Sequence, residues 1–352
     1  MTQEPSWRGF ASDNYAGIHP DVLEAIGRAN TGHDVAYGDD VITDRLRDAV
    51  KDHFGAQAQV FPVFNGTGAN VVALQAMTRR WEAVVCSTTA HVNVDEGGAP
   101  EHGAGLKLWT VPTPDGKLTP GLIDTQAWGF GDVHRAQPGA VTITQSTELG
   151  TLYTVDEITA ITEHAHSMRM GVHLDGARIS NAAAALGRGL GDFTTDAGVD
   201  AVSFGGTKNG VMIGEAVIVL NEHAAPGVDF LRKSSMQLAS KMRFISAQLL
   251  ALLSDDLWLR NAQHANAMAS MLEARVRLIP GVNVVRPVQA NAVFAIIPPA
   301  VTERLQRRFR FYTWDQNSGE VRWMCAWDTT PADVEAFATA IADEMAAENS
   351  PA

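Results

Sequence analysis

Short apolar runs alternate with segments of helical periodicity along most of this chain. Apolar runs that end in small or polar residues cover 59–64, 83–86, 106–111, 140–144, 170–174 and 201–204. Between them, apolar residues recur at helical spacing, as Leu46, Val50 and Phe54 do. Strands that alternate with helices build parallel sheets. The pattern therefore predicts an α/β fold with one large, mostly parallel sheet, to which the run 215–220 adds an antiparallel strand.

The pattern changes after a long helical segment over 256–278, which Pro280-Gly281 closes. Before it, we expect one helix over 229–253. After it, we expect strands at 282–285, 292–297, 309–312 and 321–327 and helices at 299–305 and 331–346. We therefore predict an N-terminal arm over 1–18, a large domain over 19–255 and a small α+β domain over 256–352.

Composition excludes several classes of function. The formal net charge is -13 and no basic block occurs, which argues against nucleic-acid binding. No metal-ligand spacing, signal-peptide core or apolar run of about 18 residues is present, so we expect no metal and no membrane span. Cys86 and Cys325 lie in apolar runs and read as buried residues of a reducing cytosol. We expect a cytoplasmic protein.

The most specific candidate chemistry lies in two strand-to-loop units within 170–210. The first strand ends on Asp175 and a glycine turn, and the second ends in glycines, Thr207 and Lys208. One crossover helix over 179–186 fits between them, so both side chains can emerge at the carboxyl edge of one sheet, where such sheets bind ligands. Pyridoxal 5′-phosphate needs a lysine and an acid against its pyridine nitrogen. The pair predicts such a site, with Thr207 as a hydrogen-bonding partner of the phosphate.

Three other regions offer partners for this pair. The turn Asn65-Gly66-Thr67-Gly68 leads into a helix whose free N–H groups can hold a phosphate. His91 follows a strand and can lie over an aromatic ring, with Glu96 placed to orient it. Arg322, inside an apolar strand, suits a substrate carboxylate.

Each residue also has a plain structural interpretation when it is taken alone. Lys208 is then a solvated loop lysine, Asp175 a helix cap and His91 a loop histidine. Arg322 would lie on the exposed face of an edge strand. The functional interpretation gains its weight because the residues occur together in one order along the chain.

The motifs resemble those of the low-specificity L-threonine aldolases, in the β-eliminating branch of fold-type I pyridoxal-phosphate enzymes. The resemblance spans roughly residues 11 to 345 and is closest to a bacterial subgroup that includes phenylserine aldolases. It is carried by the segments 11–14, 37–40, 65–70, 90–98, 144–148, 173–178, 206–208 and 324–328. Many family members have Glu-Asn-Thr-His-Asn where this chain reads Gln-Ser-Thr-Glu-Leu over 145–149. The resemblance implies a seven-stranded sheet domain and a small C-terminal domain.

The resemblance also implies a role for individual residues. Lys208 would bind the cofactor covalently, Asp175 would pair with its nitrogen, and His91 would stack on its ring. The other implied residues are Gly66 and Thr67 at the phosphate, Arg178 near the 3′-oxygen or the substrate, Ser12 and Arg322 at the substrate carboxylate, His134 near the substrate hydroxyl, and Tyr37, with Lys233 or Arg243, across a subunit interface.

The implied reaction is cleavage of L-threonine, L-allo-threonine and related amino acids such as phenylserine to glycine and an aldehyde. His91, His134 or a water held by one of them would be the base. The same machinery also serves β-elimination, racemisation and hydroxymethyl transfer, because the cofactor carries the chemistry. The implied assembly is a homo-oligomer, a dimer or tetramer. A pyridoxal-fold protein without activity is disfavoured by the intact lysine, and a nicotinamide oxidoreductase by the absence of G-x-G-x-x-G.

Overall fold

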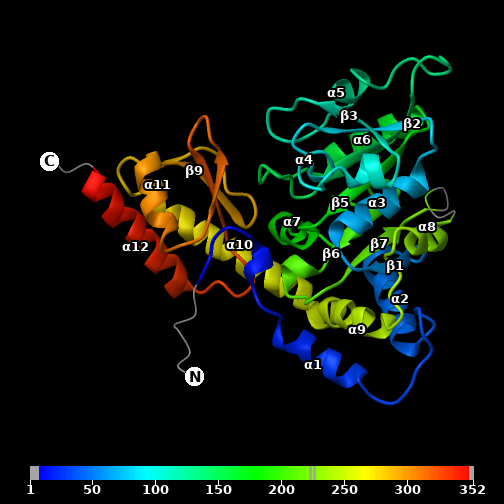
Figure 1. Ribbon diagram of the computed structural model, residues 1–352, viewed down its shortest axis with the longest axis horizontal. Coiled ribbons are helices and arrows are strands. Elements are labelled where there is room, and N and C mark those ends of the chain that lie inside the picture. The colour runs from blue at the N-terminus through cyan, green and yellow to red at the C-terminus, as the bar shows by residue number, and fades with distance from the viewer. Residues whose placement is uncertain (1–7, 222–223, 225–226, 349–352) are drawn as a thin grey trace. The chain divides into compact units, whose positions relative to one another are not determined.

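The computed structural model describes residues 8–221, 224 and 227–348, which fall into two compact units (Figure 1). One unit comprises residues 18–258, and the other combines the first 17 residues with residues 259–352. The segment expected as a free-standing arm therefore belongs to the same unit as the C-terminal domain. Across the described residues, no helix combines the length and apolar character that crossing a membrane requires.

The larger unit is built on a seven-stranded sheet in the order β1-β7-β6-β5-β4-β2-β3. Its strands are β1 (Gln59–Val63), β2 (Glu82–Ser87), β3 (Lys107–Val111), β4 (Gln137–Thr144), β5 (Gly171–Gly176), β6 (Ala201–Gly205) and β7 (Glu215–Val219). Only β7 runs against its neighbours, because it pairs antiparallel with both β1 and β6. The mostly parallel sheet predicted from the apolar runs is confirmed, as is its antiparallel strand.

Helices cover this sheet on both faces, because every residue of the central strands β6 and β7 is buried. The helices of this unit are α1 (Pro20–Ala29), α2 (Val41–Phe54), α3 (Gly66–Met77), α4 (His91–Val94), α5 (Pro120–Asp124), α6 (Val155–Ser167), α7 (Ile179–Leu186), α8 (Val228–Ser234) and α9 (Met242–Leu253), with shorter turns at Ala99–Gly103, Thr207–Asn209 and Ser254–Asp256. Helix α3 packs against β5, β6 and β7 (Figure 1). It therefore leads from the glycine turn after β1 to the middle of the sheet.

The single helix expected over 229–253 is wrong, because the chain breaks between α8 and α9. Met236 adopts a left-handed backbone with φ 61°, which ends the helical run. The break lets the side chain of Gln237 reach back to Phe64, whose backbone N–H donates to Gln237 Oε1 at 3.0 Å. Lys233 and Arg243 consequently lie on two different helices.

The smaller unit has a four-stranded antiparallel sheet in the order β10-β11-β9-β8. Its elements are β8 (Asn283–Val284), β9 (Ala292–Ile296), α11 (Pro299–Gln306), β10 (Tyr312–Asp315), β11 (Glu320–Met324) and α12 (Pro331–Glu348), and most of α10 (Leu257–Val276) belongs to it. The strand expected at 309–312 starts only at Tyr312, because Phe309 and Phe311 pack with Phe337 instead of continuing the strand.

Phe10 ties the beginning of the chain into this unit. Its ring stacks on Phe337 with the ring centroids 4.3 Å apart. Its backbone N–H donates to Arg310 O, and its carbonyl accepts from Met324 N–H. Fully burying such an aromatic side chain stabilises a fold by about 1.5–3 kcal/mol. Phe10 thereby fixes the neighbouring Ser12 beside β11.

Candidate active site

Asp175 and Lys208 both lie at the carboxyl edge of the large sheet. Asp175 pairs in register with Thr144 on β4 and Ser203 on β6, in the last rows of these strands. Strand β6 ends at Gly205, and the one-turn helix Thr207–Asn209 places Lys208 just beyond it. As the sequence predicts, the chain between Asp175 and Lys208 returns to the same edge of the large sheet.

The turn that carries Lys208 is held by a buried carboxylate, Glu215, at the start of β7. Glu215 Oε2 accepts from Gly206 N–H at 2.8 Å, and Oε1 accepts from Thr207 N–H at 3.3 Å. Burial raises the pKa of Glu215, while its hydrogen bonds with Thr207 and Gly206 and the charge of Lys208 oppose that rise. Sequence reasoning missed Glu215, because an acid at the start of an apolar strand looks like a solvated strand end.

Thr207 lies next to Lys208 in this turn, and its backbone N–H is one of the two donors to Glu215. Its expected role at the phosphate stays a prediction.

Asp175 is 5% exposed, and both of its oxygens accept hydrogen bonds. Oδ1 accepts from Ala177 N–H at 3.0 Å, and Oδ2 accepts from Asn70 Nδ2 at 2.9 Å. These two donors fix the orientation of the carboxylate at the edge of the sheet. Arg178 follows in the same turn, immediately before α7, at the same edge of the sheet.

His91 begins α4, beyond the end of β2, and is fixed at two points. Its ring Nδ1 lies 2.9 Å from Glu96 Oε1, and its backbone N–H donates to Glu148 Oε1 at 2.8 Å. The hydrogen bond with Glu96 raises the pKa of His91; burial lowers it, the Asp175 charge adds to the rise, and the Lys208 charge opposes it. The structure thus brings His91 within electrostatic reach of both Asp175 and Lys208.

Glu148 follows β4 and accepts a second hydrogen bond, from Thr144 Oγ1 at 3.0 Å. Burial raises the pKa of Glu148 to about 7, its own backbone N–H opposes the rise, and the Asp175 charge adds to it. A carboxyl group with this pKa holds a proton for part of the time at neutral pH. Glu148 lies in the segment 145–149, where the sequence departs from the common family motif, and the sequence alone assigns it no role.

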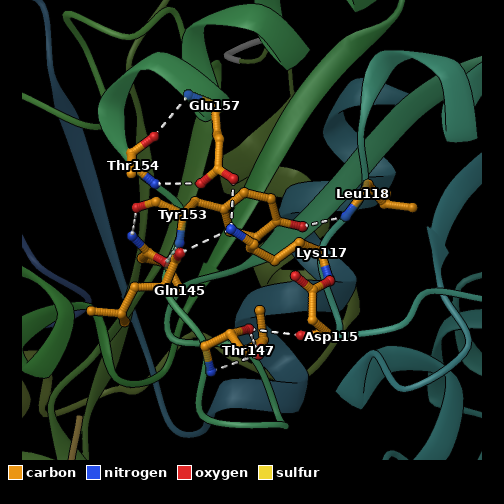
Figure 2. A network of polar contacts seen from close by, with 10 residues as sticks. Asp115, Lys117, Leu118, Gln145, Thr147, Tyr153, Thr154 and Glu157 are labelled. Carbon is orange, nitrogen blue, oxygen red and sulfur yellow. Dashed lines mark hydrogen bonds and ion pairs between the residues drawn. The ribbon is translucent and has the colours of Figure 1, made fainter. Parts of the chain in front are cut away.

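The loop that carries Glu148 is pinned by the network in Figure 2. Gln145 and Tyr153 exchange two hydrogen bonds, through Gln145 Nε2 to Tyr153 O at 2.9 Å and Tyr153 N–H to Gln145 Oε1 at 3.0 Å. The Tyr153 hydroxyl accepts from Leu118 N–H at 2.7 Å, and Lys117 pairs with Glu157 at 2.6 Å. Because the hydrogen bonds between Gln145 and Tyr153 are buried, they hold the loop that carries Glu148 beside His91.

The glycine turn after β1 is the first turn of α3. Asn65 caps this helix through its side chain, which accepts from Gly68 N–H at 2.7 Å. The backbone N–H groups of Gly66 and Thr67 belong to the first turn and have no acceptor within the helix. A methyl group added at Gly66 would meet nothing within 4 Å, whereas one at Gly68 would lie 2.2 Å from Gln237. Gln237, far away in sequence, thus borders the turn.

Ser12 and Arg322 lie in the smaller unit and share one neighbourhood there. Arg322 Nη2 donates to the carbonyl of Ala11, next to Ser12, at 3.3 Å. The guanidinium lies 4.4 Å from the ring centroid of Trp314 and 5.9 Å from that of Tyr312. These aromatic rings orient Arg322, as a cation over a π-face.

His134 lies where it cannot take the expected role within one chain. It is exposed and precedes β4, at the amino edge of the sheet, where its backbone N–H donates to Asp132 Oδ1. Strand β4 separates it from the carboxyl edge by about 23 Å, at roughly 3.3 Å per residue. The motif match placed His134 near the substrate, but a contribution from it requires a second copy of the chain.

Tyr37, Lys233 and Arg243 gather in one region. The Lys233 ammonium lies 5.2 Å from the Tyr37 ring centroid, and Tyr37 N–H donates to Ser240 O at 3.0 Å. Arg243 donates to Gly32 O at 3.5 Å, in the same loop as Tyr37. Lys233 and Arg243 thus both contact the loop that carries Tyr37.

Comparison with known proteins decides the family. A model of the β-eliminating lyase family matches residues 9–298. The chain belongs to the β-eliminating lyase family. A low-specificity L-threonine aldolase of Pseudomonas sp. is 46% identical over 340 residues, which cover 96% of this chain and 98% of the relative. One from Pseudomonas aeruginosa is 46% identical over 91% of this chain and 93% of its own. The solved Leishmania major threonine aldolase has a TM-score of 0.90 at 28% identity and covers 96% of this chain and 99% of its own.

β-Eliminating lyases of this kind use pyridoxal 5′-phosphate, as the sequence predicts for this chain. The residues fit the group on three grounds. Asp175 presents an anionic carboxylate at the sheet edge, Lys208 follows the next strand, and the open side of Gly66 leaves room at a helix N-terminus. A phosphate needs close approach to backbone N–H groups, which glycine permits.

We predict that Gly66→Ala weakens pyridoxal phosphate binding by about tenfold or more, or ~1.4 kcal/mol. The added methyl group would occupy the open space beside the N–H groups. The thermal stability of the cofactor-free protein should stay near that of the wild type, because the methyl group meets no protein atom within 4 Å. Titration of the cofactor-free protein with pyridoxal phosphate measures the affinity. Gly27→Ala on α1, which also faces open space, is the control and should bind normally.

We also predict that Glu148→Gln raises stability at alkaline pH. The pKa of Glu148 in the folded chain, about 7, lies above its usual value of 4.5, so folding loses free energy as pH rises from 4.5 through 7. Glutamine keeps an oxygen for the donors from His91 and Thr144 but cannot ionise. The variant should therefore be more stable by about 1–3 kcal/mol above pH 7 and no more stable near pH 4.5.

Thermal unfolding at both pH values tests this, with Glu157→Gln as a control of opposite sign. Burial acts to raise the pKa of Glu157, but hydrogen bonds from Lys117 and Thr154 outweigh it and leave that pKa lowered. Glu157→Gln should therefore destabilise the protein above pH 4.5. Equal stability of wild type and Glu148→Gln at pH 8 would mean that Glu148 is not buried as an anion.

Proposed function

We propose that this protein cleaves the Cα–Cβ bond of L-threonine, L-allo-threonine and related β-hydroxy-α-amino acids to glycine and an aldehyde. The observation that carries this proposal is the 46% identity to low-specificity L-threonine aldolases over nearly the full length of both chains. The aromatic substrate phenylserine belongs to the proposed range.

Bound pyridoxal phosphate would supply the electron sink that accepts the electron pair of the broken bond. Lys208 would hold it covalently, and the Asp175 carboxylate would keep a proton on the pyridine nitrogen. The first turn of α3, at Gly66 and Thr67, would hold the phosphate. Arg178, in the turn after Asp175, would bond the 3′-oxygen or the substrate.

His91 is the base that we propose for the hydroxyl proton. In the neutral ring, Nδ1–H donates to Glu96 Oε1, which leaves the lone pair on Nε2. That nitrogen can take a proton, and Glu96 then faces a positive ring. His91 would also stack on the cofactor. The two roles share one ring orientation, because Glu96 and Glu148 hold the residue at both ring and backbone.

Arg322 and Ser12 would bind the substrate carboxylate. A guanidinium can form two parallel hydrogen bonds with a carboxylate, and the Trp314 ring supports it from one side. Neither residue recognises the side chain of the substrate. The site would thus bind the carboxylate that all these substrates share and would leave the β-substituent uncontacted by these two residues. Such a site suits an enzyme with low specificity for the β-substituent.

We propose further that the protein acts in the cytoplasm as a homo-oligomer, a dimer or tetramer with the active sites at subunit interfaces. The region around Tyr37 supports the assembly, because large apolar side chains are exposed in and near it. They are Val35, Tyr37, Val41, Phe230 and Met236. The buried free thiols of Cys86 and Cys325 suit a reducing compartment.

The reaction is tested by products. The purified protein with pyridoxal phosphate should release glycine and acetaldehyde from L-threonine, and benzaldehyde from L-phenylserine. Lys208→Ala should lose the absorption band of lysine-bound cofactor and the activity together. Release of a 2-oxo acid and ammonia instead would favour β-elimination, and loss of optical purity without cleavage would favour racemisation.

Arg322→Ala should raise KM for L-threonine by roughly 10–100-fold, since a charged hydrogen-bonding group contributes about 1.5–3 kcal/mol. The absorption spectrum of the bound cofactor should not change. Arg322→Lys should recover only part of the loss, because an ammonium cannot bond bidentately. Arg308→Ala, which removes an exposed arginine from over Phe309, should leave KM unchanged. Loss of the cofactor spectrum in Arg322→Ala would assign Arg322 a structural role.

A further inference from the structure

A buried amide joins the two halves of the candidate site. Asn70, on α3, is 2% exposed. Its Nδ2 donates to Glu96 Oε1 at 2.7 Å and to Asp175 Oδ2 at 2.9 Å. An amide nitrogen has two protons, and each of them is used for one carboxylate. The orientation of the amide is thereby determined, because the opposite one would set its oxygen against two carboxylate oxygens.

The bridge connects residues from three separate parts of the chain. Glu96 follows the short helix α4 and holds the His91 ring, while Asp175 ends β5. Asn70 stands one helical turn after Gly66 on α3, so it shares a helix face with the glycine turn. One side chain thus links the ring histidine, the pyridine-nitrogen carboxylate and the helix of the phosphate turn.

This arrangement is costly for the folded chain. Glu96 Oε2 and Asn70 Oδ1 are buried and have no hydrogen-bond partner among the residues that the structure describes. Two anions share a poorly solvated space, where like charges repel strongly. If the Asn70 side chain only filled space, an apolar side chain of similar size would make the folded chain more stable. The cost indicates that the positions of the two carboxylates are what the amide maintains.

We propose that Asn70 is a positioning residue that divides its two protons between Glu96 and Asp175 and thereby sets how strongly Glu96 acts on His91. Glu96 Oε1 accepts from both Asn70 Nδ2 and His91 Nδ1. A donor from Asn70 takes up part of the negative charge on that oxygen. The His91 ring therefore meets a weaker anion than Glu96 alone would present.

The sign of the effect separates this role from simple packing. Without the Asn70 donor, Glu96 Oε1 serves only the His91 ring, so the pKa of His91 should rise. If Asn70 were only filler, its removal would loosen Glu96, and the pKa of His91 would fall toward its usual value. The charges that face His91 are Glu96 beyond its own helix, Asp175 on β5, Lys208 after β6 and Glu148 after β4.

The test is an NMR titration of ring-labelled histidine in the full-length protein, with and without pyridoxal phosphate. His91→Gln assigns the resonance. In Asn70→Ala, the pKa of His91 should rise by about half a unit or more. The acid limb of the kcat/KM profile for L-threonine should move to higher pH by the same amount. Asn70→Leu keeps the size of the side chain and adds no charge but has no donor, and it should also raise the pKa of His91.

Two matched variants complete the test. In the Glu96→Gln background, Asn70→Ala should shift the pKa of His91 by less than half as much, because the bridged charge is gone. Gln75→Ala removes another amide from α3, one that donates to Ala104 O, and should change nothing at His91. An unchanged or lower His91 pKa in both folded Asn70 variants would overturn the proposal.

The inference rests on the proposed function only where it treats His91 as the base. The titration of the His91 ring does not depend on which bond the enzyme breaks. A raised pKa together with products of β-elimination would therefore reject the proposed function and keep the role of Asn70. Aldol products together with an unchanged pKa would do the reverse.

Discussion

The gathering of three carboxyl groups around one histidine, two of them buried and one half-buried, is the interaction on which the candidate site depends. Glu96 holds the His91 ring, Glu148 holds its backbone N–H, and Asn70 joins Glu96 to Asp175. Like charges at such spacing destabilise a fold unless donors are aimed at them. Glu96 Oε1 and Glu148 Oε1 each accept two hydrogen bonds. Asp175 Oδ2 accepts one, from the Asn70 amide that it shares with Glu96. The donors come from four elements of the larger unit, so the site cannot form until the sheet has assembled.

This requirement explains why the sheet edge is so heavily braced. The β4 loop places Glu148 through the Gln145–Tyr153 exchange, and the β6 turn places Lys208 through Glu215. In both places a buried side chain accepts hydrogen bonds from backbone N–H groups, which would bind water in an open loop. Burying these polar side chains costs free energy, but their hydrogen bonds restrict the conformations of the two loops. Glu148 and Lys208 thus stand on loops whose backbone is held by buried hydrogen bonds.

The sequence predicted the sheet and its ligand edge, because buried parallel strands are continuous apolar runs and end where the chemistry begins. It predicted Asp175, Lys208 and His91 because each follows such a run directly. It did not predict Asn70, Glu215 or Gln237, because their importance comes from partners far away in sequence. The role of His134 stays a prediction that needs a second copy of the chain, because a motif match carries no information on which edge of the sheet a loop occupies. The break after α8 was missed, since Met236 is not a residue that marks a left-handed turn.

The excess of negative charge also bears on the form of the cofactor ring that this site favours. Around His91, the carboxyl groups of Glu96, Asp175 and Glu148 lie near the ammonium group of Lys208. If Asp175 takes its proposed role, a bound cofactor ring with a protonated nitrogen would place a positive charge against Asp175 and would reduce the repulsion between the carboxylates, whereas a neutral ring would not. The partial protonation of Glu148 near pH 7 relieves the same repulsion from the other side. The same carboxylates whose burial costs the folded chain stability would therefore favour the ring form that best accepts electrons.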